Sequence, residues 1–454
     1  MERDIKLTPA EIAVSVVERA CRLGATAAEV VFRQSVEFSA SVRLGEVETV
    51  KEAASRGLGL RVLLDGRQAS ASTSDLSAAA LDELAETALT LARSASADDT
   101  AGIPDAADLA TETPDLDLCD PAVLALSSDE KIRLALTAEQ AARDYDERIV
   151  NFEGGGVESS AGHMALANSL GFVGEYRSAS LSLATVPVAR DAAGRLQRAY
   201  WYDARRKLAK LEDPASIGRR AAERAVSKLG ARRVPTQSCP IVFAPEAAAS
   251  LIGHLFGAVS GDAIFRRASF LVGKLGERIA SPLVTVVDDG RLPQGLGSRP
   301  FDGEGVPTRR TVVIREGRLE SYLHNAYTAR KLGERTTGNA SRGLTGAPAV
   351  GSNNLYLVAG DSSPEAIIAS VDNGFYVTEL IGFGVNGVTG DYSRGAAGRW
   401  IERGELTFPV EEVTIAGNLL TMLKHIEIVG NDLDFRGRLA APTLKIAEMT
   451  VSGA

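Results

Sequence analysis

The stretch that decides the fold runs from residue 387 to residue 398 and reads Gly-Val-Thr-Gly-Asp-Tyr-Ser-Arg-Gly-Ala-Ala-Gly. Its glycine density is too high for an ordinary core strand, so its backbone is expected to adopt conformations that larger side chains forbid. The flanking runs 375–381 and 406–410 are rich in β-branched and aromatic residues and predict short strands. The stretch is therefore predicted to form a turn or rim between paired strands, where another chain approaches the backbone closely.

The sequence around this stretch, residues 239–454, predicts a C-terminal domain of mainly antiparallel β structure, a sheet or partial barrel with short helices. One of these helices begins at Pro245, because proline favours the first helical position. One side of this helix carries only small residues and a histidine, namely Ser250, Gly253, His254 and Gly257. Two long glycine-rich loops, 288–307 and 333–354, follow it, and loops of this length in a compact domain are commonly functional.

Residues 1–230 predict an α+β domain in which a helix followed by an antiparallel meander occurs twice. Thr8 with Glu11 and Ser127 with Glu130 form capping boxes that start the helix of each repeat. The first meander has strand-like runs at 29–34, 37–44, 46–53 and 57–64, with turns predicted at 44–45, 55–57 and 65–66. Residues 94–121 are rich in aspartate and proline and predict a surface connection, and the main domain boundary is placed at 231–239.

Bulk composition limits the classes of function. The chain has 454 residues, of which 45% are hydrophobic and 24% charged, as in an ordinary soluble protein. Its formal net charge of -9 opposes non-specific binding to a nucleic-acid backbone. Three widely spaced cysteines do not form a disulfide framework or a thiolate metal cage. We expect a cytoplasmic location, since no window suits a membrane span and residues 1–6 lack the apolar core of a signal peptide.

The residue types that carry catalysis in known hydrolases are poorly placed in this sequence. None of the four histidines pairs with another at helical metal-ligand spacing. Ser393 resembles a nucleophile, but glycine stands three residues before it instead of two, and no histidine is assignable as its base. A carboxylate pair for glycoside hydrolysis is a further alternative that the sequence leaves open. Its candidate members are Glu379, Asp391, Glu402 and Glu405.

Several motifs together resemble the TldD/PmbA family, and in particular its PmbA (TldE) branch. The main one runs from Thr389 to Leu419 and includes Gly-Asp-Tyr-Ser-Arg-Gly-Ala-Ala-Gly, and supporting matches occur at 45–48, 70–75, 300–306, 329–333 and 429–432. The resemblance implies membership of a protease built from two homologous subunits. In that family the TldD subunit carries zinc through a His-Glu-x-x-x-His helix and a later cysteine.

The sequence departs from the family's zinc motif at every ligand. By this resemblance Pro245 and Ser250 occupy the two histidine positions, and only Glu246 of the motif remains. The segment 433–441, where the catalytic branch has its cysteine, contains none. A glutamate base without metal-bound water has nothing to activate. The resemblance therefore implies no metal on this chain and zinc on the partner subunit.

We therefore expect the metal-free subunit of a heteromeric zinc metalloprotease, which completes a peptide-binding chamber beside a TldD-type homologue. Asp391, Tyr392, Ser393 and Arg394 are predicted to contact the peptide, whose strand would add to the glycine-rich rim. A stand-alone regulatory protein that binds another protein is the alternative, and an independent hydrolase is a third. The sequence leaves open a homodimer of the isolated chain and any role of Glu246 or His254.

Overall fold

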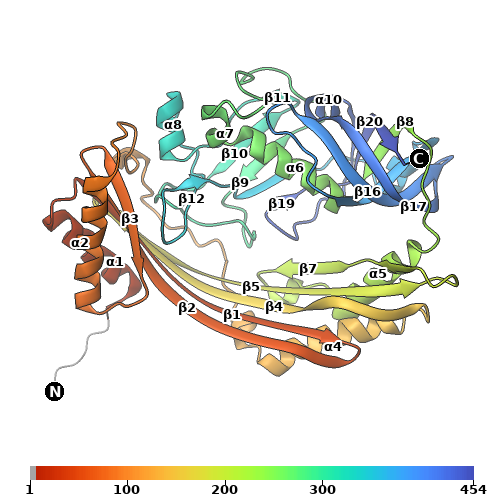
Figure 1. Ribbon diagram of the computed structural model, residues 1–454, viewed down its shortest axis with the longest axis horizontal. Helices are drawn as coiled ribbons and strands as arrows, with labels where there is room; N and C mark the ends of the chain where they lie inside the picture. Colours follow the sequence, from red (N-terminus) through yellow and green to blue (C-terminus); the bar gives the residue numbers. More distant parts are fainter. Residues whose placement is uncertain (1–6, 454) are drawn as a thin grey trace.

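The computed structural model describes residues 7–453. Residues 1–6, which bear on the expectation about a signal peptide, lie outside this range. The fold is α+β and mainly antiparallel, as predicted. A long curved sheet underlies the molecule, and the C-terminal half lies over one side of it (Figure 1). No helix within residues 7–453 is long and apolar enough to cross a membrane.

The long sheet is built from the N-terminal half of the chain. Its strand order is β3-β2-β1-β4-β5-β6, with β7 also paired to β5. The strands are β1 (Ala27–Arg43), β2 (Glu46–Leu64), β3 (Arg67–Thr73), β4 (Ile149–Asn168), β5 (Val173–Arg190), β6 (Leu196–Arg198) and β7 (Trp201–Arg205). Because β1 pairs with β4, the two predicted meanders form one continuous sheet.

Helices cover the long sheet at its two ends. They are α1 (Pro9–Arg22), α2 (Ala78–Ser94), α3 (Pro121–Ala125), α4 (Ser128–Arg143) and α5 (Pro214–Ser227). Both predicted capping boxes are present, at Thr8 and at Ser127. Helices α1 and α2 share an apolar core with one end of the sheet, while α4 and α5 cover the other end (Figure 1).

The strands are longer than the sequence indicated. Turns occur at 44–45 and 65–66 as predicted, and both sites have left-handed backbone. The turn predicted at 55–57 is wrong, because β2 continues through it while paired with β1. Gly57 and Gly59 serve another purpose there. A Cβ atom on Gly59 would lie 1.8 Å from the carbonyl oxygen of Leu344, so these glycines let a C-terminal loop dock on the strand.

Residues 94–121 are more than a surface connection. They contain a short 3-10 helix, Ala106–Asp108, and the side chains of Ile103, Leu116 and Leu118 are buried. The backbone of this segment also bonds to both halves, since Ala110 N–H donates to Gly305 and Ala179 N–H donates to Leu118. The composition of the segment did not indicate this packing. A few apolar side chains are enough to hold a polar segment in place when the surfaces of both halves bury them.

The C-terminal half combines a small barrel with a second sheet. In the barrel sheet the strand order is β17-β16-β15-β8-β20-β18, and a further pairing of β17 with β20 closes five strands, which confirms the predicted partial barrel. These strands are β8 (Gln237–Phe243), β15 (Asn373–Ile381), β16 (Asp391–Glu402), β17 (Glu405–Asn418), β18 (Ile426–Val429) and β20 (Leu444–Ser452). The pairing of β8 with β15 is parallel.

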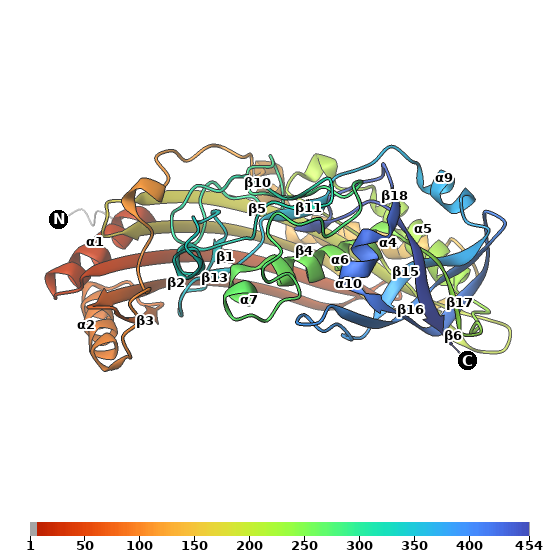
Figure 2. The same ribbon diagram turned by 90° about the horizontal axis from the view of Figure 1, so that it is seen from above.

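The second sheet of the C-terminal half has the order β11-β10-β9-β14-β19. Its strands are β9 (Val286–Asp289), β10 (Arg310–Arg315), β11 (Arg318–Leu319), β14 (Asn354–Leu357) and β19 (Leu439–Ala440), and β12 (Ala340–Ser341) pairs separately with β13 (Ala349–Val350). Helices α6 (Pro245–Val259), α7 (Gly261–Phe265), α8 (Ala326–Leu332), α9 (Pro364–Ala369) and α10 (Leu419–Lys424) complete the half, which lies above the long strands (Figure 2).

The glycine-rich stretch is only in part a turn. Residues 387–390 form a turn, but the remainder belongs to β16 and pairs with β15 and β17. The small residues are needed for close strand packing, since a Cβ atom on Gly398 would lie 1.9 Å from the carbonyl oxygen of Tyr376. The prediction of a turn or rim over the whole stretch is therefore wrong beyond Gly390.

Candidate functional site

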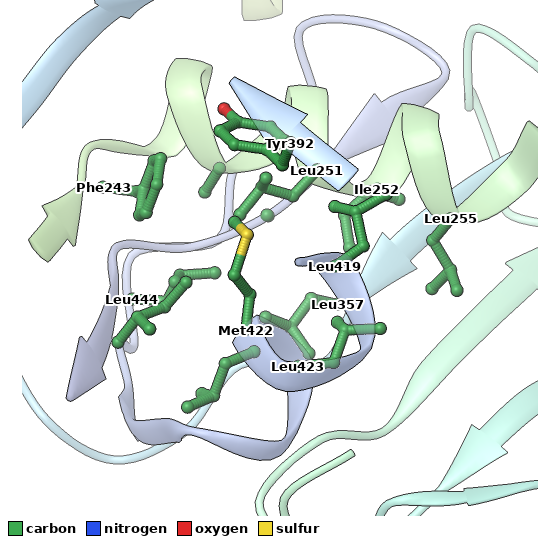
Figure 3. Packing of buried hydrophobic residues seen from close by; sticks show 14 of the residues in the cluster. Phe243, Leu251, Ile252, Leu255, Leu357, Tyr392, Leu419, Met422, Leu423 and Leu444 are labelled. Atoms are coloured by element: carbon green, nitrogen blue, oxygen red, sulfur yellow. The ribbon is translucent and has the colours of Figure 1, made fainter. Parts of the chain in front are cut away.

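Helix α6 carries the residues that correspond to the family's metal motif. It starts directly after β8 with Pro245 at its first position. Leu251, Ile252 and Leu255 bury one side of the helix in the C-terminal core, as Figure 3 shows. The sequence Pro-Glu-Ala-Ala-Ala-Ser therefore places Pro245, Glu246 and Ser250 on partly exposed positions of the helix.

A cavity of about 410 Å³ opens beside the start of α6, between the C-terminal half and the long sheet. Its walls come from β7 and α5 of the N-terminal half and from α6, β15 and the segment 432–443 of the C-terminal half. Side chains that line it include Trp201, Arg224, Glu246, Tyr376, Asp432 and Arg436. Burial raises the pKa of Tyr376 to about 12, so its phenol stays neutral at physiological pH. The fold thus brings residues from both halves of the chain together beside Pro245 and Glu246 at the start of α6.

Two arginines hold the carboxylate of Glu246. Arg224 Nη2 on α5 lies 3.1 Å from Glu246 Oε2, and Arg436 Nη1 lies 3.3 Å from Glu246 Oε1. Both guanidinium groups also stack on Trp201, with their Cζ atoms 4.1 and 4.2 Å from the ring centroid. Arg436 in addition lies 3.0 Å from an oxygen of Asp434. The cationic charge that balances Glu246 is therefore supplied by protein side chains.

This arrangement does not fit the zinc site that the family resemblance implies for a catalytic subunit. Pro245 has no side-chain donor atom, and Ser250 Oγ donates its hydrogen bond to the carbonyl of Ala247 at 2.8 Å. Arg436 lies in the segment where a cysteine ligand would be needed, and it is permanently cationic. Within residues 7–453 there is no group of three or more His, Cys, Asp or Glu side chains arranged to hold a metal ion.

The four predicted peptide-contact residues do not share one surface. Asp391 and Ser393 are exposed, whereas Tyr392 is only 1% exposed and points to the opposite face of β16. Arg394 shares the face of Tyr392 and is half-buried. Asp391 accepts hydrogen bonds from Thr389 and Asn418 at the start of the strand. Tyr392 therefore belongs to the core, and contact through an exposed Tyr392 side chain is not supported by its burial.

The other hydrolase alternatives find no support in the geometry. In the described residues the histidine ring nearest this strand, His254, packs against Tyr392, on the face that Ser393 does not share. Asp391 and Glu402 stand at opposite ends of β16. Glu379 is paired with Lys228, whose Nζ lies 2.7 Å away. Glu402 and Glu405 face each other across a surface turn, so these carboxylates do not form a pair around a cleft.

Sequence reasoning missed the residues that define the cavity, namely Trp201, Arg224 and Arg436. They lie on β7, on α5 and in the segment after β18, and no motif links them. A weak signal was available, because Arg436 falls within the segment 433–441 that replaces the expected cysteine region. Because the chain keeps Glu246, an arginine in that segment was a candidate to form an ion pair with it.

Comparisons with known proteins give a consistent assignment. Residues 28–92, 121–229 and 236–453 match domain 1, the central domain and the C-terminal domain of the PmbA/TldA metallopeptidases. The sequence is 40% identical over 426 residues to metalloprotease PmbA of Escherichia coli O157:H7, which covers 94% of this chain and 92% of that protein.

Two solved structures share the fold over nearly the whole chain. One is from Bacteroides thetaiotaomicron VPI-5482 and is named a "putative modulator of DNA gyrase"; it has a TM-score of 0.90, 30% identity and 98% coverage of both chains. The other is TldE from Thermococcus kodakarensis, with a TM-score of 0.89, 25% identity, and coverage of 97% of this chain and 100% of that one.

Proposed function

This chain belongs to the PmbA/TldD metallopeptidase family, and on that premise we propose that it is the subunit without metal in a two-subunit zinc metallopeptidase. The partner is a TldD-type homologue that carries His-Glu-x-x-x-His and the zinc ion. This chain completes the chamber in which small or unfolded peptides are cleaved. The proposal places it in the cytoplasm, in keeping with its three free cysteines.

The observation that carries the proposal is the pairing of Glu246 with Arg224 and Arg436. In a metallopeptidase the motif glutamate activates a water molecule that the metal has made acidic. Here two guanidinium groups hold that carboxylate, and the neighbouring positions offer no metal ligand. Because an arginine holds each oxygen of this carboxylate, the geometry supports a structural role for Glu246.

The residues that line the cavity beside Glu246 are suited to form part of the wall of a peptide chamber. The cavity lies between the two layers of the molecule and is bounded by Trp201 and Tyr376, which offer apolar faces with one polar edge. Asp391 and Ser393 are proposed to contact the peptide through their exposed side chains. The expected strand addition is wrong for these residues, because their backbone already pairs with β17 on one side and with residues 384–386 on the other. Arg394 lies on the other face of β16, together with Tyr392.

The test is a reconstitution. Bound zinc and peptidase activity are measured for this chain alone, for a His-Glu-x-x-x-His homologue alone, and for the mixture. We expect turnover only in the mixture, with zinc on the homologue. Stoichiometric zinc in the isolated chain would refute the proposal. If the two chains do not associate and the mixture shows no activity, the stand-alone regulatory role becomes the better account, in line with the gyrase-modulator name of one structural relative.

A further inference from the structure

Where α6 faces β16, three side chains each have a polar atom that finds no hydrogen-bond partner within residues 7–453. These atoms are His254 Nε2, Tyr392 OH and Arg394 Nε, all of them buried. The rings of His254 and Tyr392 lie edge to face, with centroids 6.1 Å apart and an interplanar angle of 79°. Figure 3 shows the Tyr392 oxygen at the end of the ring directed away from Met422 and Leu423. We refer to these three residues as the HYR cluster.

The cluster has an excess of hydrogen-bond donors. The hydroxyl of Tyr392 and the guanidinium of Arg394 both donate, and the imidazole donates in its Nε2–H form. Within residues 7–453, the side chain of Arg394 makes neither a hydrogen bond nor an ion pair, and its Nε is the guanidinium nitrogen that is buried without a partner. A buried donor without an acceptor destabilises the fold, so three at one place call for an acceptor that residues 7–453 do not supply.

The surroundings leave room for such an acceptor. On the same side of α6, a Cβ atom on Gly257 would have no atom within 4 Å, and one on Gly253 would meet only Leu439, at 3.2 Å. Leu439 also lines the cavity beside Glu246. The small-residue side of α6 therefore connects that cavity with the HYR cluster, and a chain lying along it would bring its end to the three donors.

We infer that His254, Tyr392 and Arg394 form a binding site for a carboxylate of a bound peptide, either its C-terminal carboxylate or an acidic side chain. One guanidinium and two neutral donors match a single negative charge, whereas the chain's net charge of -9 disfavours a dianion. The inference rests on the proposed function in that it takes a peptide as the ligand. It adds to that function a defined subsite on the metal-free chain.

The electrostatics of His254 provide a direct readout. Burial lowers the pKa of His254, and the positive charge of Arg394 lowers it further. A carboxylate bound among the three side chains opposes the field of Arg394, so it should raise this pKa. The readout needs neither a partner subunit nor catalytic turnover.

The experiment uses the isolated full chain labelled at its four histidines for NMR, with the His254 signal assigned through His254→Gln. Three probes are titrated: acetyl-trialanine with a free carboxylate, its C-terminal amide, and an amide of the same length with one glutamate. We expect the free acid to bind at least about tenfold more tightly than the amide, the factor typical of one charged hydrogen bond. Its binding should raise the pKa of His254.

The glutamate-containing amide separates the two sources of carboxylate. If this probe binds as tightly as the free acid, the site accepts any carboxylate. If it binds as weakly as the plain amide, the site is specific for the peptide C-terminus. Equal affinity of all three probes, or no binding of the acid at millimolar concentration, overturns the inference. Because the partner subunit is absent, such a failure leaves the proposed function untouched.

Variants locate the site. Tyr392→Phe and Arg394→Gln should each weaken binding of the acid about tenfold. Arg403→Gln is the matched control, since Arg403 is an exposed arginine in the turn at the other end of β16. Tyr392→Phe removes only an oxygen that has no partner, so the variant should keep its melting temperature and remain testable if Arg394→Gln misfolds. Unchanged affinity in Tyr392→Phe would also overturn the assignment.

Discussion

Glu246 and Arg224 form an ion pair of 3.1 Å that joins the helix of the degenerate metal motif to the helix that covers the long sheet. Arg436 closes the pair from a third segment, and Trp201 packs against both guanidinium groups. The Glu246 carboxylate therefore links two layers of the fold through arginines of two other segments.

Arg436 is expected to contribute strongly to stability. Its side chain is 17% exposed and pairs with Glu246 and Asp434. Arg436→Ala removes one cation from each carboxylate and leaves Arg224 beside Glu246 and Arg205 beside Asp434. We expect a loss of about 2 kcal/mol of unfolding free energy, because the variant loses hydrogen bonds to charged groups and the packing of Arg436 on Trp201. The measurement is chemical denaturation with the melting temperature as a check.

Arg233→Ala is the control for this prediction. Arg233 pairs with Glu412 on the surface, where the two side chains are 58% and 64% exposed, and such pairs contribute about 0 to 1 kcal/mol. Equal losses for the two variants would contradict the role given to Arg436.

A second prediction concerns the contact between the halves at Gly59. A methyl group at this position would collide with the backbone of Leu344, which has no flexible end to move aside. Gly59→Ala should therefore displace the loop around Leu344 and cost about 3 kcal/mol, at the upper end for overpacking. Increased protease cleavage near residues 342–348 and a lower melting temperature would show it.

Gly162→Ala serves as the control in the same sheet. A Cβ atom there would meet its nearest neighbour, Ser178 Oγ, at 3.4 Å, an ordinary contact. This variant should stay close to the wild-type melting temperature. A comparable loss in both variants would mean that the sheet, and not the docking of Leu344, is sensitive to substitution.

These contacts show where sequence reasoning succeeded and where it failed. The helix starts at Thr8 and Ser127 were predicted correctly, because a capping box is a signal within four residues. The strand break predicted at 55–57 was wrong, because the reason for Gly57 and Gly59 is Leu344, almost three hundred residues away. No local pattern can distinguish a glycine needed for a turn from one needed for close approach.

The candidate site divides in the same way. That Pro245 and Ser250 are not histidines is read directly from the sequence, and their correspondence to the family's metal motif stays a prediction from the resemblance. The burial of Tyr392 could not be read from the sequence, because Tyr392 and Ser393 alternate between two faces of β16 only once that segment is known to be a strand. The partners of Glu246 come from distant elements, so they could be identified only once the fold was known.

A third prediction follows from a buried acid at the junction of the halves. Burial raises the pKa of Glu304 to about 8, and the nearby carboxylates of Asp302 and Glu29 act in the same direction. The folded pKa exceeds the unfolded value of about 4.3, so the folded state binds more protons between these values. The unfolding free energy should therefore fall as pH rises from about 4.3 to about 8.

Glu304→Gln should flatten this fall, because an amide does not ionise. Denaturation curves at a series of pH values measure it, and Glu83→Gln, at an exposed position of α2, is the control. An equally steep dependence in Glu304→Gln and wild type would mean that other groups, such as Asp288 with its pKa raised to about 6 by burial, dominate the slope.

The last prediction separates a structural glutamate from a catalytic one in the reconstituted enzyme. Glu246→Gln removes the negative charge but keeps an oxygen that can accept from Arg224 or Arg436. If the chemistry belongs to the partner, peptide turnover by the mixture should stay within about twofold of wild type. The equivalent change in the partner's motif should lower turnover by about a hundredfold or more, as for loss of a general base. Size-exclusion chromatography confirms that both mixtures assemble. A hundredfold loss from Glu246→Gln in an intact assembly would show that this chain takes part in the chemistry, and the metal-free role would then be wrong.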